Sequence, residues 1–315
     1  MITTARPRRF ALSLSMNPSN PYREHEMNLP VSDQSEFRLG GNLLINRLGF
    51  GAMRLPCNGF RGAARDPETG RAVLRRAVEL GVNLVDTAEF YQSGDGAVRA
   101  NALIREALHP YPSNLVIATK VGVVFNPDGS HRPATGAEMR RLVEENLQSL
   151  GLDHLDLVYL RIGEMAVPHG ESLAERFEAL AKLCEEGLIR HLGISNVDIE
   201  HLAQARSIAP VVAVQNHFHL GKRDDISLLN ACAAEGIAFC PFFPLGGGSQ
   251  RLDDGRLARI AVRHGATTAQ IALAWLLAHS PVMLAIPGTG AIAHLEENVA
   301  AGNIRLTKED HAELA

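Results

Sequence analysis

The sequence predicts an α/β protein built as one (β/α)8 TIM barrel, preceded by a short N-terminal β-hairpin. From about residue 37 onward, short apolar segments alternate with amphipathic segments of helical period. The apolar segments are rich in Val, Ile and Leu, as expected for parallel strands buried on both faces. Eight such repeats in roughly 260 residues match the length of one barrel domain.

Composition excludes several classes of protein. Of 315 residues, 46 % are hydrophobic and 21 % are charged, and the formal net charge is −4. The sequence has no basic block typical of nucleic-acid binding and no apolar run near the roughly 18 residues of a membrane span. The four cysteines form no C-x-x-C pair and no metal-ligand pattern, so we expect a reduced cytoplasmic protein without a bound metal.

The first 36 residues differ from the rest of the chain. Arg6, Arg8 and Arg9 precede a short apolar run that Ser13 and Ser15 interrupt, which argues against a signal peptide. We expect a disordered N-terminal tail over residues 1–36 and a barrel domain over residues 37–315.

The start of the domain has clear local signals. Gly40-Gly41 separates Phe37–Leu39 from Leu43–Ile45, which predicts a β-hairpin. Asp66 and Pro67 suit the N-cap and first position of a helix that extends to Leu80 and ends before Gly81. The eight barrel strands are predicted at Asn46–Gly51, Val82–Asp86, Leu115–Thr119, Leu155–Leu160, Ile189–Ile194, Val211–Gln215, Ile237–Phe242 and Val282–Ile286. Further helices are predicted at Gly136–Leu150, Leu173–Glu186, Asp224–Glu235 and Thr267–Ala278.

A doubly wound open sheet is the alternative architecture. It would call for a G-x-G-x-x-G segment after the first strand, and none is there. In a barrel, chemistry belongs at the carboxyl ends of the strands, where Asp86, Lys120 and Arg161 stand.

Three of these residues suggest a reaction. Asp86 and Lys120 end neighbouring strands and can pair, and Tyr91 follows five residues after Asp86. A lysine near a tyrosine stabilises the phenolate, so we expect a lowered Tyr91 pKa and a proton donor for a carbonyl oxygen. Such a reduction also needs a hydride, which implies a nicotinamide. A Schiff-base lyase with Lys120 as nucleophile is a second interpretation.

Six motifs in the same order resemble the aldo-keto reductase superfamily. They are Gly49-Phe-Gly-Ala-Met53, Asp86-Thr-Ala-Glu-Phe-Tyr91, Thr119-Lys120, Gly193-Ile-Ser-Asn196, Gln215, and Ile286-Pro-Gly-Thr289 continuing to Leu295-Glu-Glu-Asn298. The resemblance extends over residues 37–315. It implies that Asp86, Tyr91 and Lys120 are three members of the catalytic tetrad. Arg161 stands where the family usually has His, and it cannot deprotonate in the working range.

The resemblance also implies an NADPH site. Ser195, Asn196 and Gln215 match residues that hold the nicotinamide carboxamide, and Phe242 matches the aromatic residue on which the ring stacks. The segment Pro244, Leu245, Gly246, Gly247 and Gly248 matches the loop over the pyrophosphate. Thr289, Glu297 and Asn298 match contacts to the 2′-phosphate and adenine. The full predicted cofactor set is Gly51, Ala52, Met53, Asp86, Ser195, Asn196, Gln215, Phe242, Pro244, Leu245, Gly246, Gly247, Gly248, Thr289, His294, Glu297 and Asn298.

One departure in this set concerns the choice of cofactor. His294 stands where many family members place an Arg against the 2′-phosphate, and His is a weaker, titratable partner. We expect NADPH, with NADH as an alternative.

Subgroup patterns narrow the substrate. Ile104-Arg-Glu-Ala-Leu-His-Pro-Tyr111, Leu160-Arg-Ile162 and Pro241-Phe-Phe-Pro-Leu-Gly-Gly247 resemble the bacterial pyridoxal reductase branch, which implies reduction of pyridoxal to pyridoxine. The segment Val121–Pro133 is expected to shape the substrate site. Non-catalytic β-subunits of potassium channels also resemble this family, so a nicotinamide-binding regulatory subunit is the competing class. We expect a small carbonyl substrate and a monomer or small homo-oligomer.

Overall fold

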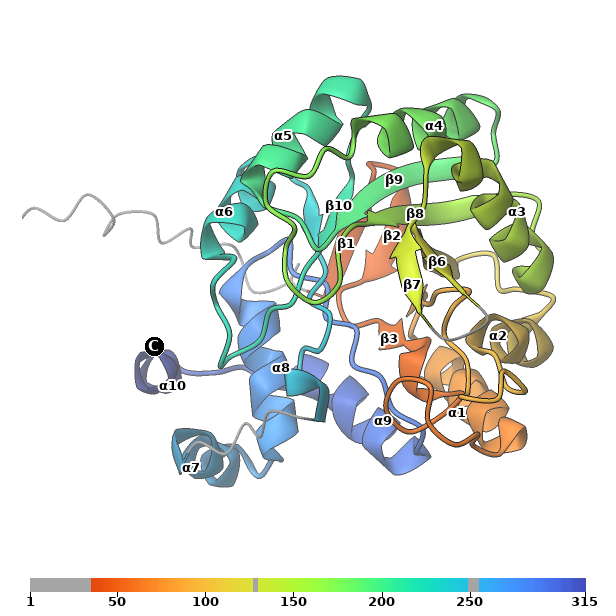
Figure 1. Cartoon of the computed structure of the whole chain (residues 1–315). Helices are drawn as coiled ribbons and strands as arrows, with labels where there is room; N and C mark the ends of the chain where they lie inside the picture. Colours follow the sequence, from red (N-terminus) through yellow and green to blue (C-terminus); the bar gives the residue numbers. More distant parts are fainter. Residues whose placement is uncertain (1–34, 127–129, 249–254) are drawn as a thin grey trace, which may run out of the picture. The chain divides into compact units, whose positions relative to one another are not determined.

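The computed structural model of the chain describes residues 35–126, 130–248 and 255–315. The predicted tail, residues 1–36, lies almost entirely outside this part of the chain. Seven parallel strands form one curled sheet with helices around it (Figure 1). In chain order, these strands are β3 (Phe50–Gly51), β4 (Leu84–Asp86), β5 (Val116–Val121), β8 (Leu155–Arg161), β9 (Ile189–Ser195), β10 (Ala213–Gln215) and β11 (Ala238–Phe239).

The sheet is closed by backbone hydrogen bonds rather than by an eighth regular strand. The Phe239 N–H donates to Val282 O at 2.8 Å, and the Leu284 N–H donates to Phe239 O at 2.8 Å. On the other side, the Ala285 N–H donates to Arg47 O at 2.8 Å. The segment from Val282 to Ala285 is therefore paired with Phe239 of β11 on one side and with Arg47, shortly before β3, on the other. This pairing closes a (β/α)8 barrel.

Two predicted strands need correction at this seam. Val282–Ile286 forms only isolated bridges, Phe239 to Met283 and Leu48 to Ala285. The predicted strand Asn46–Gly51 is divided, because Asn46 ends β2 (Leu43–Asn46) and only Phe50–Gly51 forms a regular barrel strand, while Leu48 makes a single bridge to Ala285. Asn46 is tied elsewhere, since its N–H donates to Asn83 Oδ1 at 2.7 Å and its Nδ2 donates to Gly81 O at 2.6 Å.

Antiparallel pairing joins β1 (Glu36–Leu39) to β2. Leu39 and Ile45 are fully buried and belong to the apolar cluster inside the barrel, together with Leu84, Val116 and Leu157. The two strands therefore fill the end of the barrel opposite the carboxyl ends of the strands. A larger cluster lies between the sheet and the surrounding helices.

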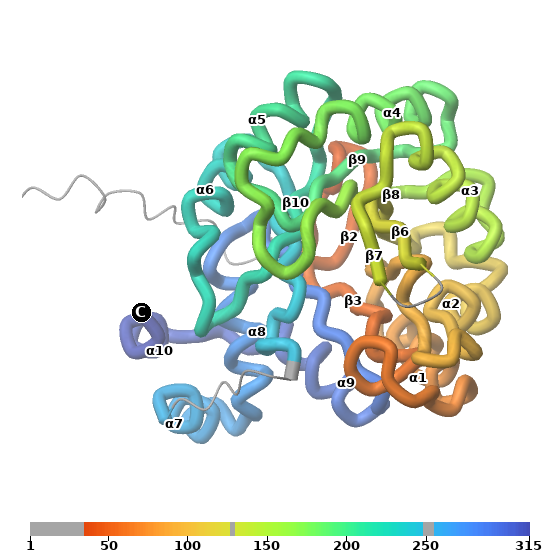
Figure 2. The backbone as a smooth tube through the Cα atoms, in the orientation of Figure 1, coloured from red at the N-terminus to blue at the C-terminus, as the bar shows by residue number. Residues whose placement is uncertain are grey.

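Helices cover the outside of the sheet, as the backbone tube also shows (Figure 2). They are α1 (Pro67–Glu79), α2 (Ala100–Leu108), α3 (Met139–Leu150), α4 (Ala174–Glu185), α5 (Ile199–Ile208), α6 (Ile226–Ala234), α7 (Gly255–His264), α8 (Thr268–His279), α9 (Ile292–Ala300) and α10 (Lys308–Leu314). Short 3-10 helices are η1 (Ala52–Arg54), η2 (Gly136–Glu138), η3 (Gly246–Gly248) and η4 (Ala301–Asn303). Within the described ranges, no helix is long and apolar enough to cross a membrane.

Local signals at the helix ends act as expected. The Asp66 side chain accepts hydrogen bonds from the Glu68 and Thr69 N–H groups and caps α1, which begins at Pro67. Gly81 follows the C-terminus of α1, where a left-handed residue is needed, and its φ is 89°. The predicted helix from Gly136 is divided into η2 and α3, because Glu138 forms a capping box with Thr135.

Arg47 links the closing seam to α8, which gives a test of barrel closure. Its buried guanidinium donates to Met283 O at 3.1 Å, to Leu277 O at 2.6 Å and to Ser280 O. Replacing Arg47 with Ala leaves these carbonyls without that donor. We expect the free energy of unfolding in urea to fall by roughly 2–4 kcal/mol.

Arg38→Ala is the matched control, because Arg38 is exposed on β1. It should change stability by less than about 0.5 kcal/mol. Equal losses in the two variants would contradict a special role of Arg47.

Candidate active site

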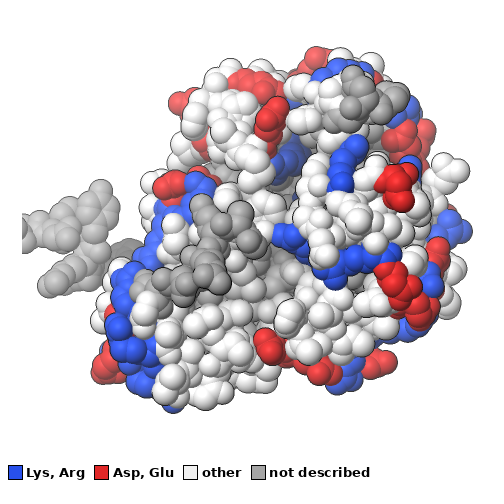
Figure 3. Space-filling view, turned by 60° about the horizontal axis from the view of Figure 1, so that its bottom comes forward, with Lys and Arg blue, Asp and Glu red and all other residues white. Residues whose placement is uncertain are grey.

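A cavity of about 750 Å³ opens at the carboxyl ends of the strands. Twelve residues of the predicted site line it: Gly51, Met53, Asp86, Tyr91, Lys120, Arg161, Gln215, Phe242, Pro244, Leu245, Gly247 and Thr289. In the space-filling view, Lys and Arg side chains border a hollow in the face shown (Figure 3). The four residues predicted to be catalytic therefore share one cavity, although they come from three separate segments of the chain.

A buried ion pair forms the floor of the site. Lys120 Nζ lies 2.6 Å from Asp86 Oδ1 and donates to Thr87 O at 2.9 Å. The second carboxylate oxygen, Asp86 Oδ2, accepts from Gln215 Nε2 at 2.7 Å. All three side chains are almost fully buried. Burial alone lowers the pKa of Lys120, but the Asp86 carboxylate and the Tyr91 phenol outweigh it, so the lysine pKa lies above its usual value.

Tyr91 lies directly beside this pair. Lys120 Nζ is 4.9 Å from the centre of the Tyr91 ring. Burial raises the Tyr91 pKa above 10.0, and the opposing effect of Lys120 is smaller. The expectation of a lowered pKa is therefore wrong for this structure, because removing the phenol from water disfavours the phenolate more than the ammonium group favours it. Tyr91 is a protonated phenol at neutral pH.

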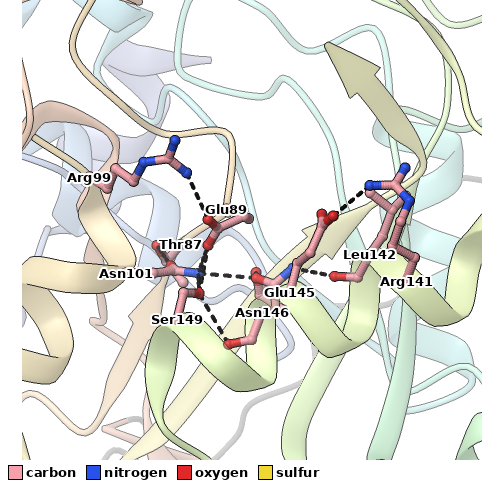
Figure 4. Close-up of polar contacts among 10 residues, drawn as sticks. Thr87, Glu89, Arg99, Asn101, Arg141, Leu142, Glu145, Asn146 and Ser149 are labelled. Carbon is pink, nitrogen blue, oxygen red and sulfur yellow. Dashed lines mark hydrogen bonds and ion pairs between the residues drawn. The ribbon is translucent and has the colours of Figure 1, made fainter. Parts of the chain in front are cut away.

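A network of polar side chains connects β4, β5 and the loop that leads to Tyr91 (Figure 4). Asn101 on α2 accepts from Thr87 Oγ1 at 2.8 Å and donates to Glu89 Oε2 at 2.8 Å. Thr87 follows Asp86, and Glu89 stands two residues before Tyr91, so Asn101 fixes the path of the loop between them.

The same network reaches β5 through α3. Asn146 Oδ1 accepts from Thr119 Oγ1 at 2.6 Å and from Asn101 Nδ2 at 3.2 Å. Ser149 Oγ donates to Glu89 Oε2 at 2.6 Å. Thr119 precedes Lys120, so the buried amides connect the residues next to Asp86 and Lys120. Sequence reasoning missed this network, because its members come from β5, the loop after β4 and two helices that are far apart in the chain.

Arg161 ends β8 and points along the cavity wall. Its Nη1 donates to Ser195 Oγ at 3.2 Å, and its Nη2 donates to Glu164 O. Its Cζ lies 5.0 Å from the centre of the Phe242 ring. Burial lowers the Arg161 pKa below its usual value, while Tyr91 and Asp86 oppose that shift.

The structure places Ser195 and Asn196 outside the cavity lining. Ser195 accepts the hydrogen bond from Arg161. Asn196, with a left-handed φ of 62°, donates its Nδ2 to Ile162 O, Glu164 O and Ala166 O at 2.9–3.2 Å. Its amide hydrogens therefore hold the loop after β8. Only its Oδ1 is left for the predicted contact to a carboxamide.

The remaining residues of the predicted cofactor site fall into two groups, those that line the cavity and those that do not. Gly247 has a φ of 65° and lines the cavity, and its carbonyl accepts from Arg54, which the sequence reasoning had not included. Thr289 also lines the cavity. Outside the lining lie Ala52, Gly246, His294, Glu297 and Asn298. On α9, His294 and Glu297 are exposed, whereas Asn298 is buried.

Aromatic side chains that the sequence had not singled out cover one side of the cavity. Phe125 on β6 (Val123–Phe125) lies 5.4 Å from Phe90 and 6.2 Å from Phe60, measured between ring centres. The Arg61 guanidinium lies 4.1 Å above the Phe125 ring. β6 pairs with β7 (His131–Pro133), so the predicted substrate-shaping segment is a hairpin at the cavity, with residues 127–129 outside the described part. The sequence feature that could have pointed to Phe60 and Arg61 is the long connection between β3 and α1 in which they lie.

His217 and His219 stand two residues apart just after β10. His217 stacks on Phe242 with ring centres 5.2 Å apart and an angle of 20°. Burial, with His219 and Lys222 nearby, lowers the His217 pKa to about 4. His217 is therefore a neutral ring behind Phe242. No group of three or more His, Cys, Asp or Glu side chains in the described ranges could hold a metal ion.

The cavity can accept a nicotinamide dinucleotide. Gln215 turns its Nε2 toward Asp86, which leaves the buried Oε1 without a hydrogen-bond partner in the cavity wall. A carboxamide N–H is the group that would satisfy it. Gly247, Gly288 and Gly290 also line the cavity and leave backbone accessible there. Arg54, Arg65 and Arg161 supply positive charge along the same wall.

The fold and this site define a class of protein: a parallel barrel whose buried Lys–Asp pair supports a tyrosine at the mouth, suited to oxidation and reduction at a carbonyl or alcohol group. The chain belongs to the Aldo/keto reductase family, which it matches over residues 47–315. It is an oxidoreductase.

Curated relatives agree with this assignment. Pyridoxine 4-dehydrogenase of Escherichia coli is 44 % identical over 272 residues, which cover 85 % of this chain and 93 % of that protein. An uncharacterized oxidoreductase of Schizosaccharomyces pombe is 39 % identical and covers 87 % of each chain.

Solved structures share the fold. A thermostable aldo-keto reductase in complex with the inhibitor epalrestat is 31 % identical with a TM-score of 0.75, covering 89 % of this chain and 98 % of that one. An aldo-keto reductase from Klebsiella pneumoniae in complex with NADPH is 28 % identical with a TM-score of 0.74, covering 89 % and 93 %.

Asn101 gives a test of the polar network. Asn101→Asp places a second carboxylate against Glu89, in place of the 2.8 Å amide contact. We expect the free energy of unfolding at pH 8 to fall by roughly 1–3 kcal/mol. The carboxylate pair raises a folded-state pKa, so the folded protein binds a proton more tightly than the unfolded chain. Stability is therefore lost as pH rises and partly regained at pH 5.

Asn101→Ala is the control, because it removes the amide without adding charge. Its loss of stability should be nearly the same at pH 5 and pH 8. Parallel pH profiles for the Asp and Ala variants would contradict the contact with Glu89.

Proposed function

We propose that this protein reduces an aldehyde or ketone to an alcohol with NADPH, using Tyr91 as the general acid. The observation that carries the proposal is the position of Lys120. Its Nζ is fixed by Asp86 and Thr87 O on the floor of the cavity and lies 4.9 Å from the Tyr91 ring. A cation held there stabilises negative charge that develops on the phenol oxygen as it gives up its proton.

Bound NADPH supplies a hydride to the carbonyl carbon. The residues of the chain handle the proton and the charge. Tyr91 donates its phenolic proton to the carbonyl oxygen, and Lys120 stabilises the resulting phenolate. Asp86 keeps Lys120 charged and in place, and Gln215 orients the Asp86 carboxylate. The products are the alcohol and NADP⁺, and solvent returns the proton to Tyr91.

Arg161 acts in this proposal as a fixed donor. Its guanidinium lies at the cavity wall between Ser195 and the Phe242 ring. It can donate a hydrogen bond toward a carbonyl oxygen, and it keeps its charge throughout the working pH range. The position usually held by His therefore keeps a hydrogen-bond donor but loses a titratable group.

The Schiff-base alternative is disfavoured by the state of Lys120. A lysine nucleophile must be neutral, which requires a lowered pKa. Here Asp86 and Tyr91 together outweigh the opposing effect of burial and raise the Lys120 pKa. The ammonium group is also engaged by Asp86 and by Thr87 O.

Pyridoxal is the substrate that we favour within this class. The aromatic wall of Phe60, Phe90 and Phe125 suits a planar ring, and His131 and Arg161 offer polar contacts beside it. The similarity to pyridoxine 4-dehydrogenase supports the same choice. We further propose a reduced cytoplasmic enzyme, in keeping with four free cysteines in the described residues, acting as a monomer or small homo-oligomer.

Tyr91→Phe tests the role of the phenol as general acid. We follow the loss of NADPH absorbance with pyridoxal, a simple aromatic aldehyde and a ketose. The wild type should reduce pyridoxal fastest, and Tyr91→Phe should lower kcat by about 100-fold or more while NADPH binding is kept.

Tyr111→Phe is the matched control, because the Tyr111 hydroxyl donates to Leu150 O at 2.6 Å away from the cavity. Tight NADPH binding without turnover on any carbonyl would instead favour a regulatory subunit. Trapping of Lys120 by borohydride without nicotinamide would favour the lyase.

The pH dependence of kcat tests the protonation state of Tyr91. Since burial raises the Tyr91 pKa above 10.0, the phenol stays protonated through the neutral range, and kcat for reduction should be flat from about pH 6 to 9. The rate should fall only at higher pH, where the proton is lost, whereas alcohol oxidation, which needs the phenolate, should rise with pH.

Arg161→His should introduce an inflection in kcat near pH 6.5, because it places an imidazole at the end of β8. A wild-type inflection near that pH that persists in His131→Asn would contradict the assignment of Arg161.

A further inference from the structure

Arg65 reaches the cavity from an unexpected element. It belongs to the loop between β3 and α1, yet its guanidinium lies against Gly290, in the segment that follows the closing seam of the barrel. Both residues line the cavity, together with Thr289. A methyl group at position 290 would overlap Arg65 Nη1 and Cζ, so the guanidinium can occupy this place only because residue 290 is glycine.

The loop that carries Arg65 is held in a defined shape. Cys57 and Ala64 form an antiparallel bridge, and the Arg65 N–H donates to Pro56 O at 2.8 Å. At its other side, the Gly94 N–H donates to Gly62 O at 2.8 Å. Asn58 Oδ1 accepts from Arg65 Nη2 and orients the guanidinium. The loop thus presents this cation at a fixed point, which lowers the entropic cost of binding an anion there.

The charge of Arg65 is not neutralised within the described part of the chain. Within those residues, its only side-chain hydrogen bond goes to the neutral amide of Asn58, and no Asp or Glu of the described ranges forms an ion pair with it. Its buried Nε has no hydrogen-bond partner there either. An arginine so placed at a cavity wall is suited to a phosphate, which accepts several N–H bonds in one plane.

Position 294 contrasts with Arg65. His294 lies on α9, is exposed, and is not part of the cavity lining. The residue at which the sequence predicts the 2′-phosphate contact therefore offers neither a permanent charge nor a place in the cavity wall. Thr289 does line the wall, one residue before Gly290 and beside the Arg65 guanidinium.

We propose that Arg65, admitted by Gly290, binds the 2′-phosphate of NADPH and sets the preference for NADPH over NADH. This inference rests on the proposed use of NADPH. The cation comes from the loop before α1 instead of from α9, and Thr289 adds a hydroxyl at the same point. Because NADH lacks the 2′-phosphate, Arg65 should affect the binding of one cofactor and not the other.

The test is equilibrium binding by calorimetry, independent of turnover. Wild type, Arg65→Gln, Arg65→Lys and Gly290→Ala are titrated with NADPH, NADH, 2′,5′-ADP and 5′-AMP. Arg65→Gln should weaken binding of NADPH and 2′,5′-ADP by roughly 10- to 100-fold, with NADH and 5′-AMP changed less than about twofold. Arg65→Lys should be intermediate. Gly290→Ala should reproduce the loss, because its methyl group displaces the guanidinium.

Unchanged NADH binding shows that each variant is folded. Arg75→Gln on the exposed face of α1 is a matched change of charge and should leave all four affinities unaltered. Equal losses for NADPH and NADH would place Arg65 at the pyrophosphate and overturn the proposal. A larger loss of selectivity in His294→Ala than in Arg65→Gln would also overturn it. If wild type bound neither cofactor, the proposed function itself would fail.

Discussion

The site depends on a buried ion pair between Lys120 and Asp86. A charge pair removed from water is stable only when its geometry is good and its remaining hydrogen-bonding capacity is used. Here the ammonium also donates to Thr87 O, and the second carboxylate oxygen accepts from Gln215. Adjacent parallel strands make this possible, because β4 pairs with β5 and brings both strand ends to the same rim. In the proposed reaction, Tyr91 can act as an acid because a fixed cation lies beside its largely desolvated phenol.

Rigidity at this rim comes from outside the cavity. The amides of Asn101 and Asn146 bind the threonines that neighbour Asp86 and Lys120, and Glu89 ties the Tyr91 loop to α2 and α3. Such a fully satisfied network restricts the side chains and backbone together. The short strand β4 and the irregular loop after it therefore keep a defined geometry without regular secondary structure.

The positive charges along the cavity wall are of two kinds. Lys120 is matched by Asp86, whereas Arg54, Arg65 and Arg161 line the same wall with hydrogen bonds to neutral acceptors. In the proposed reaction the ion pair supports proton transfer, and the arginines suit a ligand with phosphates. Phe60, Phe90 and Phe125 form an apolar side, so one cavity combines an anion-binding part with a surface for a planar substrate.

The sequence alone determined the order of strands and helices, and it placed Asp86, Lys120, Arg161 and Gln215 at strand ends, because periodicity and capping are local properties. It could not determine the closing seam, where Val282–Ile286 forms only isolated bridges, since pairing there depends on how two distant ends of the chain meet. It also gave the wrong direction for the Tyr91 pKa, because desolvation depends on the surrounding packing. Asn196 turned toward the loop after β8, and Arg65 reached Gly290, through contacts between segments remote in sequence. Only the tertiary structure decides such contacts, since they arise when the barrel closes.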